Sequence, residues 1–458
     1  MAAGGSVVTL SRLRSKLRSV LKVEVRPGTY RDSIVLMLAS ARMAAVDGVE
    51  AAMAAMATPL NLDVLMQSGL WDPSLESCQP DDLILAARGV DPEAGIRAGE
   101  AALSERLKSE RENEAGPASR TVRAAARRLP GANLAVISVP GQHAPWACWD
   151  ALLAGLSVFC FSDNVVVEDE VQLKEEALRR GLLFMGPDCG TAIIDGVGLG
   201  FWNEVPRGHV GIVGASGTGI QELCCLLAHQ GVGVSHAIGV GGRDLSPVVG
   251  GHMTREAIRR LDDDADTEVI VVVSKQVAGE LSLPSLPTTR KPLVPALLAP
   301  GIDLTEVALR VGGGSLPPDP KPLTWDGPVE GIFSGGTLRD EAALIWQADQ
   351  ASDRFRAIDY GADEFTRGRP HPMIDQRLRL EAIGRARGLV YLDVVLGHGA
   401  HPDPARDLAP ALAGRPAVVA LIGTEEDPQG LSRQRAAFEA AGAHVYLSNS
   451  RAAHMLVQ

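Results

Sequence analysis

The sequence has little cysteine: six residues among 458, at positions 78, 148, 160, 189, 224 and 225. None of the six forms a C-x-x-C pair or shows the spacing of a zinc site, so the pattern argues against a disulfide-stapled scaffold and against a bound metal. Scattered, unpaired cysteines are typical of a reducing compartment. We therefore expect a cytoplasmic protein.

Long apolar runs and concentrated positive charge are also missing. The longest apolar runs, such as 269–273, have the length of a strand, so no membrane span is expected. The formal net charge is −12 and no basic patch runs through the body of the chain, which argues against a nucleic-acid partner. The first 22 residues hold five Lys or Arg side chains but no apolar signal-peptide core. We interpret 1–20 as a basic tail, with a targeting sequence as the alternative.

The stretch HVGIVGASGTGIQE at 209–222 combines a short apolar strand, a turn of small residues and the start of an apolar helix. It lacks the lysine of a P-loop and is not a clean G-x-G-x-x-G, so a nucleotide site of either type is not expected. Free backbone N–H groups and the positive end of the helix dipole would attract an anion to Ser216, Gly217, Thr218 and Gly219. The alternative is a tight strand-to-helix turn in which Ser216 or Thr218 caps the helix.

Hydrophobic residues make up 46% of the chain and charged residues 22%, as in an ordinary globular protein with a large core. From residue 134 onward, strand-like and helix-like segments alternate, which predicts parallel sheets with helical crossovers. We predict an α/β protein in these segments: a small α/β domain at 21–112, a linker at 113–130, an α/β unit at 131–206, a second at 207–318, a linker at 319–328 and a third at 329–458.

The glycine turn occurs twice. S-G-T at 216–218 and S-G-G-T at 334–337 occupy matching places between a strand and a helix in two of the units. If the turns faced each other, one anion could lie between two helix dipoles. We therefore add Gly335, Gly336 and Thr337 to the candidate phosphate-binding residues.

Several polar residues follow predicted strands, where ligands of parallel sheets collect. Arg243 comes after two glycines and could bind a carboxylate or phosphate through both arms of its guanidinium, with an ion pair to Asp244 as the alternative. Asp188 and Cys189 lie in the turn after the third strand of the 131–206 unit, and are candidates for substrate binding.

A proline-braced loop, TRGRPHPMID at 366–375, holds three further candidates: Arg369, His371 and Asp375. His371 could act as an acid or base or donate to a substrate oxygen, or it could simply bond the local backbone. His401 follows a predicted buried strand and could form a polar site, but its spacing to other histidines and carboxylates gives only a weak case for a metal.

Together, seven motifs resemble the FdrA family, which belongs to the succinyl-CoA synthetase superfamily. The motifs are GPDCGTAII (186–194), GHVGIVGASGTGIQE (208–222), AIGVGGRDLS (237–246), FSGGTLRDEA (333–342), GRPHPMID (368–375), LDVVLGHGAHPDPA (392–405) and GTEEDPQ (423–429). The resemblance implies a small N-terminal α/β domain, a degenerate CoA-binding-type Rossmann domain at 131–206 and two flavodoxin-like ligase lobes at 207–318 and 329–458.

The resemblance also implies roles for particular residues. In the synthetases, two helix N-termini hold a phosphohistidine, and the matching helices here would start at 216–218 and in the 397–404 region, with 335–336 as a second candidate. Glu222 matches a glutamate that contacts the phosphohistidine, and Glu425 one that orients backbone or substrate, unless it merely starts a helix. The relay histidine should follow the strand at 293–298, but 275–315 contains no histidine.

For function, the resemblance implies oxamate carbamoyltransferase activity in purine breakdown through allantoin, with two partner proteins. Carbamoyl phosphate or phosphate would be the substrate. That reaction needs a held phosphate and a stabilised oxyanion but neither phosphohistidine nor CoA. The alternatives are an acyl-CoA synthetase, for which CoA would be used, and a non-catalytic scaffold that binds a metabolite. Partner subunits and an oligomeric state are expected in each case.

Overall fold

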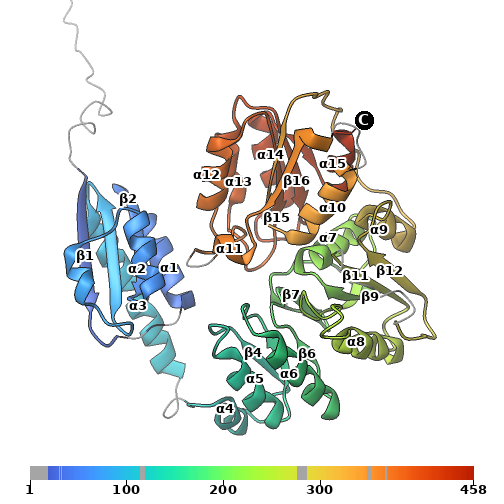
Figure 1. Ribbon diagram of the computed structural model, residues 1–458, viewed down its shortest axis with the longest axis horizontal. Coiled ribbons are helices and arrows are strands. Elements are labelled where there is room, and N and C mark those ends of the chain that lie inside the picture. The colour runs from blue at the N-terminus through green and yellow to red at the C-terminus, as the bar shows by residue number, and fades with distance from the viewer. Residues whose placement is uncertain are drawn as a thin grey trace, which may run out of the picture. The chain divides into compact units, whose positions relative to one another are not determined.

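The computed structural model describes residues 19–29, 31, 33–113, 119–275, 286–347, 352–366 and 369–457. Its contacts divide the chain into two units, one of residues 1–118 with 367–369 and one of residues 119–366 with 370–458 (Figure 1). Nearly all of the predicted basic tail lies outside the described residues. None of the described helices is long and apolar enough to cross a membrane.

The N-terminal unit is a small α/β fold. Its elements are β1 (Val20–Arg26), α1 (Ser33–Ala44), β2 (Val49–Met56), α2 (Pro59–Gln67), β3 (Leu83–Gly89) and α3 (Pro92–Asn113). The strands form an antiparallel sheet in the order β1-β3-β2. Apolar residues of α1 and α3, such as Met43 and Ile96, pack with Leu85 of the central strand and build the core.

A three-stranded parallel sheet follows, in the order β4-β5-β6. Its elements are α4 (Val122–Arg128), β4 (Leu134–Ile137), α5 (Ala144–Leu153), β5 (Ser157–Cys160), α6 (Val167–Arg179) and β6 (Phe184–Met185). Helix α4 lies in the segment predicted as a linker. The turn between β4 and α5 carries Gly141, where a side-chain Cβ would meet the Asp163 carbonyl oxygen at 2.2 Å, so this glycine serves close backbone packing.

The first lobe, as we name the part built on β9–β12, contains the first glycine turn. Its elements are β7 (Thr191–Ile194), β8 (Val197–Gly200), β9 (Arg207–Ala215), α7 (Gly217–Ala228), β10 (Val234–Gly239), α8 (His252–Asp263), β11 (Val269–Ser274), β12 (Leu293–Leu297) and α9 (Leu304–Gly312). The sheet order is β12-β11-β9-β10-β7-β8, in which β9 to β12 run parallel. The β7–β8 hairpin was not predicted.

The second lobe, built on β13–β17, contains the second glycine turn. Its elements are β13 (Val329–Phe333), α10 (Gly336–Gln347), β14 (Phe355–Asp359), α11 (Asp363–Thr366), α12 (Arg377–Arg385), β15 (Leu389–Val395), α13 (Pro404–Leu412), β16 (Ala417–Ile422), α14 (Leu431–Ala440), β17 (His444–Tyr446) and α15 (Asn449–Met455). The strands are parallel in the order β14-β13-β15-β16-β17, the flavodoxin-like order. The predicted α/β class with two flavodoxin-like lobes is therefore confirmed.

Both lobes reverse their strand order at the same place. The first lobe switches between β9 and β11, and the second between β13 and β15. In open α/β sheets, ligands bind beyond the carboxyl ends of the strands at such a switch. The two glycine turns follow β9 and β13 directly, so the fold places each turn at its lobe's switch point.

Candidate functional site

The two glycine turns touch each other. The Ser216 hydroxyl of the first turn lies 2.5 Å from the Thr337 hydroxyl of the second. A Cβ added to Gly335 would lie 2.7 Å from a side-chain carbon of Thr218, so only glycine allows this approach. Helices α7 and α10 therefore start against each other, and their positive dipole ends converge.

Ser216 caps α7 by accepting a hydrogen bond from the Gly219 amide at 2.9 Å. The capping role foreseen as the alternative is therefore real. The first-turn amides of Gly217 and Thr218 donate to no acceptor among the described residues. These two groups stay available to an anion.

A second feature points to a ligand at the start of α7. Thr191, at the beginning of β7, is 1% exposed, and its hydroxyl has no hydrogen-bond partner among the described residues. That hydroxyl lies 3.2 Å from the position of a Cβ on Gly217. A buried hydroxyl without a partner is unfavourable, and a bound anion at Gly217 would satisfy it.

Asp393 of β15 holds the second glycine turn in place through hydrogen bonds to its backbone. The carboxylate accepts from the Ser334 amide at 2.7 Å and the Gly335 amide at 2.8 Å. Arg379, fully buried, pairs with the same carboxylate at 3.0 Å. Asp393 uses the first two amides of the turn, and no described acceptor takes the Gly336 and Thr337 amides at the start of α10. The Asp359 carboxylate lies beside Gly336, 2.9 Å from the position of a Cβ on that residue.

Lys275 adds a cation beside the first turn. Ser274 pairs with Ala215 in the parallel ladder, so Lys275 follows next to Ser216. The ammonium makes no ion pair or hydrogen bond with any residue that the structure describes. Its positive charge nevertheless lowers the pKa values of Asp188 and Asp359, against the larger effect of burial.

Those two carboxylates titrate near neutrality. Burial raises the pKa of Asp188 to about 7, although the side chain keeps an exposed surface, and the neighbouring Asp163 raises it further. Burial likewise raises the pKa of Asp359 to about 6. Groups with such pKa values can exchange protons at physiological pH, so the predicted substrate-binding residue Asp188 also suits a general base.

The 397–404 region, the first choice for the facing helix start, makes no hydrogen bond or ion pair with residues 216–219 among the residues that the structure describes. Helix α13 is capped there by Asp403, whose carboxylate pairs with Arg433 at 2.7 Å and bonds Gln434 at 2.8 Å. A carboxylate at the helix start occupies the place where an anion would bind. The second candidate, at 335–336, is the one that lies against α7.

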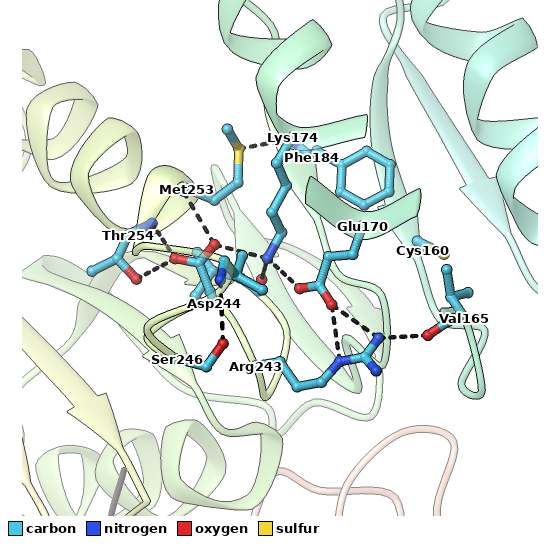
Figure 2. Close-up of polar contacts among 12 residues, drawn as sticks. Cys160, Val165, Glu170, Lys174, Phe184, Arg243, Asp244, Ser246, Met253 and Thr254 are labelled. Atoms are coloured by element: carbon cyan, nitrogen blue, oxygen red, sulfur yellow. Dashed lines mark hydrogen bonds and ion pairs between the residues drawn. The ribbon is translucent and has the colours of Figure 1, made fainter. Parts of the chain in front are cut away.

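Arg243 does not offer an open guanidinium fork. Figure 2 shows its Nε bound to Glu170 at 2.9 Å and its Nη2 bound to the Val165 carbonyl at 2.7 Å. The alternative pairing with Asp244 is wrong too, because that carboxylate bonds the fully buried Lys174 at 2.7 Å. Arg243 therefore belongs to an ion network that joins α6 to the first lobe.

His371 is buried, and burial lowers its pKa to about 4. Its Nδ1 accepts from the Met373 amide at 3.2 Å, which is the local backbone bond foreseen as the alternative. The Nε2 side lies near Gly361 and the Ser334 carbonyl, at the edge of the second turn. Arg369 groups by its contacts with the N-terminal unit, whereas His371 belongs to the other unit.

The other candidates have structural partners. His401 lies 3.1 Å from Asp407, and Asp375 pairs with Arg377 at the start of α12. Glu425 accepts from the Ser432 amide at 2.9 Å, which makes it the helix-start carboxylate foreseen as its alternative role. Cys189 is buried, which raises its pKa to about 12 and closes it to a substrate.

Glu222 is fully buried beneath the first turn rather than exposed to a reacting group. Its carboxylate accepts from the Asn449 amide at 2.8 Å. The described contacts therefore give it a structural partner, and no catalytic contact.

Sequence reasoning missed Lys275, Thr191 and Asp393. Lys275 carried a usable signal, because it directly follows the almost entirely β-branched strand β11 at the ligand-binding edge. Thr191 and Asp393 carried none, since a buried threonine or aspartate in a strand has many structural uses.

Three family models match parts of the chain. They describe the AllF heavy metal-associated domain at residues 19–123, a CoA binding domain at 206–282 and a CoA-ligase domain at 332–456. The CoA binding match falls on the first lobe, whereas we predicted the CoA-binding-type domain at 131–206. The boundary between these units remains a prediction.

The description of the first model suggests a heavy metal, but the residues do not fit one. Among the residues that the structure describes, no group of three or more His, Cys, Asp or Glu side chains could hold a metal ion. Cys78 is the single cysteine in the matched range. We therefore derive no metal chemistry for this unit.

Relatives cover the chain to different extents. The uncharacterized protein YahF of Escherichia coli (strain K12) is 37% identical over 88% of this chain and 90% of its own length. The alpha subunit of the ADP-forming succinate–CoA ligase of Aquifex aeolicus (strain VF5) is 33% identical over 36% of this chain, which spans about half (54%) of that subunit. The corresponding subunit of Staphylococcus epidermidis (strain ATCC 35984) is 30% identical over 33% of this chain.

Among solved structures, a dinucleotide-forming acetyl-coenzyme A synthetase 1 of Ca. Korarchaeum cryptofilum aligns with 74% of this chain and 84% of its own. The identity is 14% and the TM-score 0.32, too low to support a conclusion about this chain. The sequence relatives and the ligase domain models carry the assignment instead: the chain belongs to the family of YahF, within the succinyl-CoA-synthetase-like superfamily.

Proposed function

We propose that this chain is an enzyme subunit that makes or breaks the bond between an acyl group and phosphate, in the manner of an acyl-CoA ligase. The observation that carries the proposal is the contact between the two glycine turns, with hydroxyls 2.5 Å apart. Two helix starts, the Lys275 ammonium, which pairs with no residue that the structure describes, and the Thr191 hydroxyl all supply donors to one anion. The relatives named as ligase alpha subunits support the ligase class, and partner subunits are part of the proposal.

The chemistry follows from where the charges lie. A nucleophile of the acceptor forms a bond to the acyl carbon, the bond from that carbon to the phosphate oxygen breaks, and the phosphate leaves with the electron pair. Lys275 and the two helix starts stabilise the departing phosphate. Asp188, with its pKa near 7, accepts the proton of the nucleophile.

Carbamoyl transfer is the second candidate, and two sequence observations favour it. The segment 275–315 has no histidine to relay a phosphoryl group. The β4–α5 turn, read Pro140-Gly141-Gln142-His143, also lacks a G-x-G-x-x-G pattern for a CoA or dinucleotide phosphate. Carbamoyl phosphate is itself an acyl phosphate, so the same donors would serve it, with oxamate as the acceptor and no CoA required.

Phosphate release separates the two candidates. We expect the purified protein, with any proteins that co-purify, to release phosphate from acetyl phosphate when CoA is present, or from carbamoyl phosphate when oxamate is present. The rate should exceed that of a Gly217→Glu variant by at least about a hundredfold, the typical effect of losing an oxyanion donor. Equal, background rates for both proteins with both acceptors would contradict the proposal.

A further inference from the structure

The two facing helices carry a buried glutamate at the same place. Glu222 is the sixth residue of α7 and Glu341 the sixth residue of α10. Both side chains are at most 1% exposed. Buried glutamates are rare unless they are bonded, so a matching pair behind two converging helix starts calls for an explanation.

Each glutamate caps a helix of the opposite lobe. Glu222, in the first lobe, accepts from the amide of Asn449, the first residue of α15 in the second lobe, at 2.8 Å. Glu341, in the second lobe, accepts from the amide of Leu304, the first residue of α9 in the first lobe, at 2.8 Å. The Asn449 side chain also donates to Glu341 at 2.7 Å, which links the two caps.

The two carboxyl groups differ in how they are satisfied. Both oxygens of Glu341 accept N–H donors, which suits an ionised carboxylate, and these donors oppose the burial that raises the pKa of Glu341 to about 7. The second oxygen of Glu222 is buried and has no partner among the described residues. A buried anionic oxygen without a donor is costly, whereas a protonated carboxyl removes that charge.

The groups around Glu222 favour the protonated, neutral form of its carboxyl group. The titratable groups that face it are Glu341 on α10, Asp393 and Tyr391 on β15, Asp303 before α9, and Cys225. All are neutral or negative, and no described cation pairs with Glu222. Burial raises the pKa of Glu222 well above its ordinary value, and the charge of Glu341 raises it further.

We propose that Glu222 and Glu341 are positioning residues that interlock the two lobes, and that Glu222 acts as a neutral acid. The reciprocal caps fix α7 against α10 and so set the distance between the Gly217 and Gly336 amides. A neutral Glu222 leaves one negative charge behind the helix starts instead of two, which preserves their attraction for an anion. Only the effect on phosphate rests on the proposed function; the interlock stands on the contacts alone.

Three variants test the interlock: Glu222→Gln, which imitates the neutral acid; Glu222→Leu, which removes the acceptor for Asn449; and Glu306→Gln, an exposed control on α9. The readouts are the melting temperature of the ligand-free protein from pH 5 to 9 and the dissociation constant of inorganic phosphate. Because the folded protein keeps a proton that the unfolded chain releases above about pH 4.5, wild type loses stability as the pH rises. Glu222→Gln should lack this component, so its melting temperature relative to wild type rises with pH.

Glu222→Leu should melt lower than wild type and bind phosphate about tenfold more weakly or worse, while Glu306→Gln matches wild type. If Glu222→Leu does not fold, Asn449→Ala, which cuts the link to Glu341, should weaken phosphate binding severalfold.

A Glu222→Gln variant whose melting temperature shows the same pH dependence as wild type would contradict the proposal that Glu222 is a neutral acid. Unchanged phosphate affinity in folded Glu222→Leu and Asn449→Ala would overturn the positioning role. A wild-type protein that binds no phosphate would refute the proposed function, and the ligand-free melting curves would still decide the interlock.

Discussion

Lys275→Met is expected to lower the rate of phosphate release from an acyl phosphate by about a hundredfold. Lys275 follows β11 beside Ser216, and no described residue neutralises its ammonium. Removing one preformed donor to a charge that develops in the transition state typically costs about 10²–10³ in rate. Steady-state phosphate release with saturating acceptor measures the effect.

The controls separate charge from folding. Lys275→Arg keeps the positive charge and should retain part of the rate. Lys321→Met changes an exposed lysine in the segment that connects α9 to β13, and this variant should behave as wild type. The melting temperature of Lys275→Met should stay near that of wild type, since its side chain is exposed. A normal rate in Lys275→Met would remove the lysine from the site.

Lys174→Met is expected to cost about 3–5 kcal/mol of stability, the largest effect on folding that we predict. Figure 2 shows the Lys174 ammonium between Glu170 at 2.8 Å and Asp244 at 2.7 Å, and it also donates to the Val240 carbonyl at 3.0 Å. All three charged groups are at most 1% exposed. Methionine matches the length of the lysine stem but leaves the Asp244 carboxylate buried without its cation, and Glu170 keeps only its pairing with Arg243.

Denaturant unfolding at neutral pH measures this loss. Arg435→Gln provides the matched control, because Arg435 pairs with Glu439 one helical turn away at 2.7 Å on a partly exposed face. Breaking that pair should cost less than about 1 kcal/mol. A loss of the same small size in Lys174→Met would mean that the network in Figure 2 does not hold α6 to the first lobe.

Strand and helix order could be predicted because the signals are local. The run 269–273 is nearly all β-branched and became the buried strand β11, and the small residues at 214–219 became the turn before α7. The β7–β8 hairpin was not predicted because its strands have four residues each and β8 carries two glycines, so no alternation of apolar and polar residues marks them.

The facing of the two glycine turns was predicted as a possibility, because the repeat is visible in the sequence. Which turn faces 216–219 was not decided by sequence, since 335–337 and 397–404 both hold glycines before a helix. The distinguishing residue is Asp403: its carboxylate caps α13 and puts a negative charge at that helix start. Such a cap can be recognised only once the helix start is known.

Roles of polar side chains were the least predictable part. Arg243, Glu425 and Asp375 all sit near strand ends or helix starts, as ligand-binding residues do, yet each is paired within the protein. Their partners lie on other elements or depend on local backbone geometry. Conversely, Thr191 is a candidate ligand-binding residue only because its hydroxyl has no partner among the described residues and lies beside Gly217. Both facts depend on tertiary packing and cannot be read from the sequence.

Isothermal titration of inorganic phosphate into wild type, Gly217→Ala and Gly217→Glu tests the central claim, that an anion binds between the starts of α7 and α10. A Cβ at Gly217 would lie 3.2 Å from the Thr191 hydroxyl, so the alanine variant should bind phosphate only a few times more weakly. The glutamate variant adds a negative charge at the helix start and should bind at least about a hundredfold more weakly. Equal phosphate affinity in all three folded proteins would contradict the account.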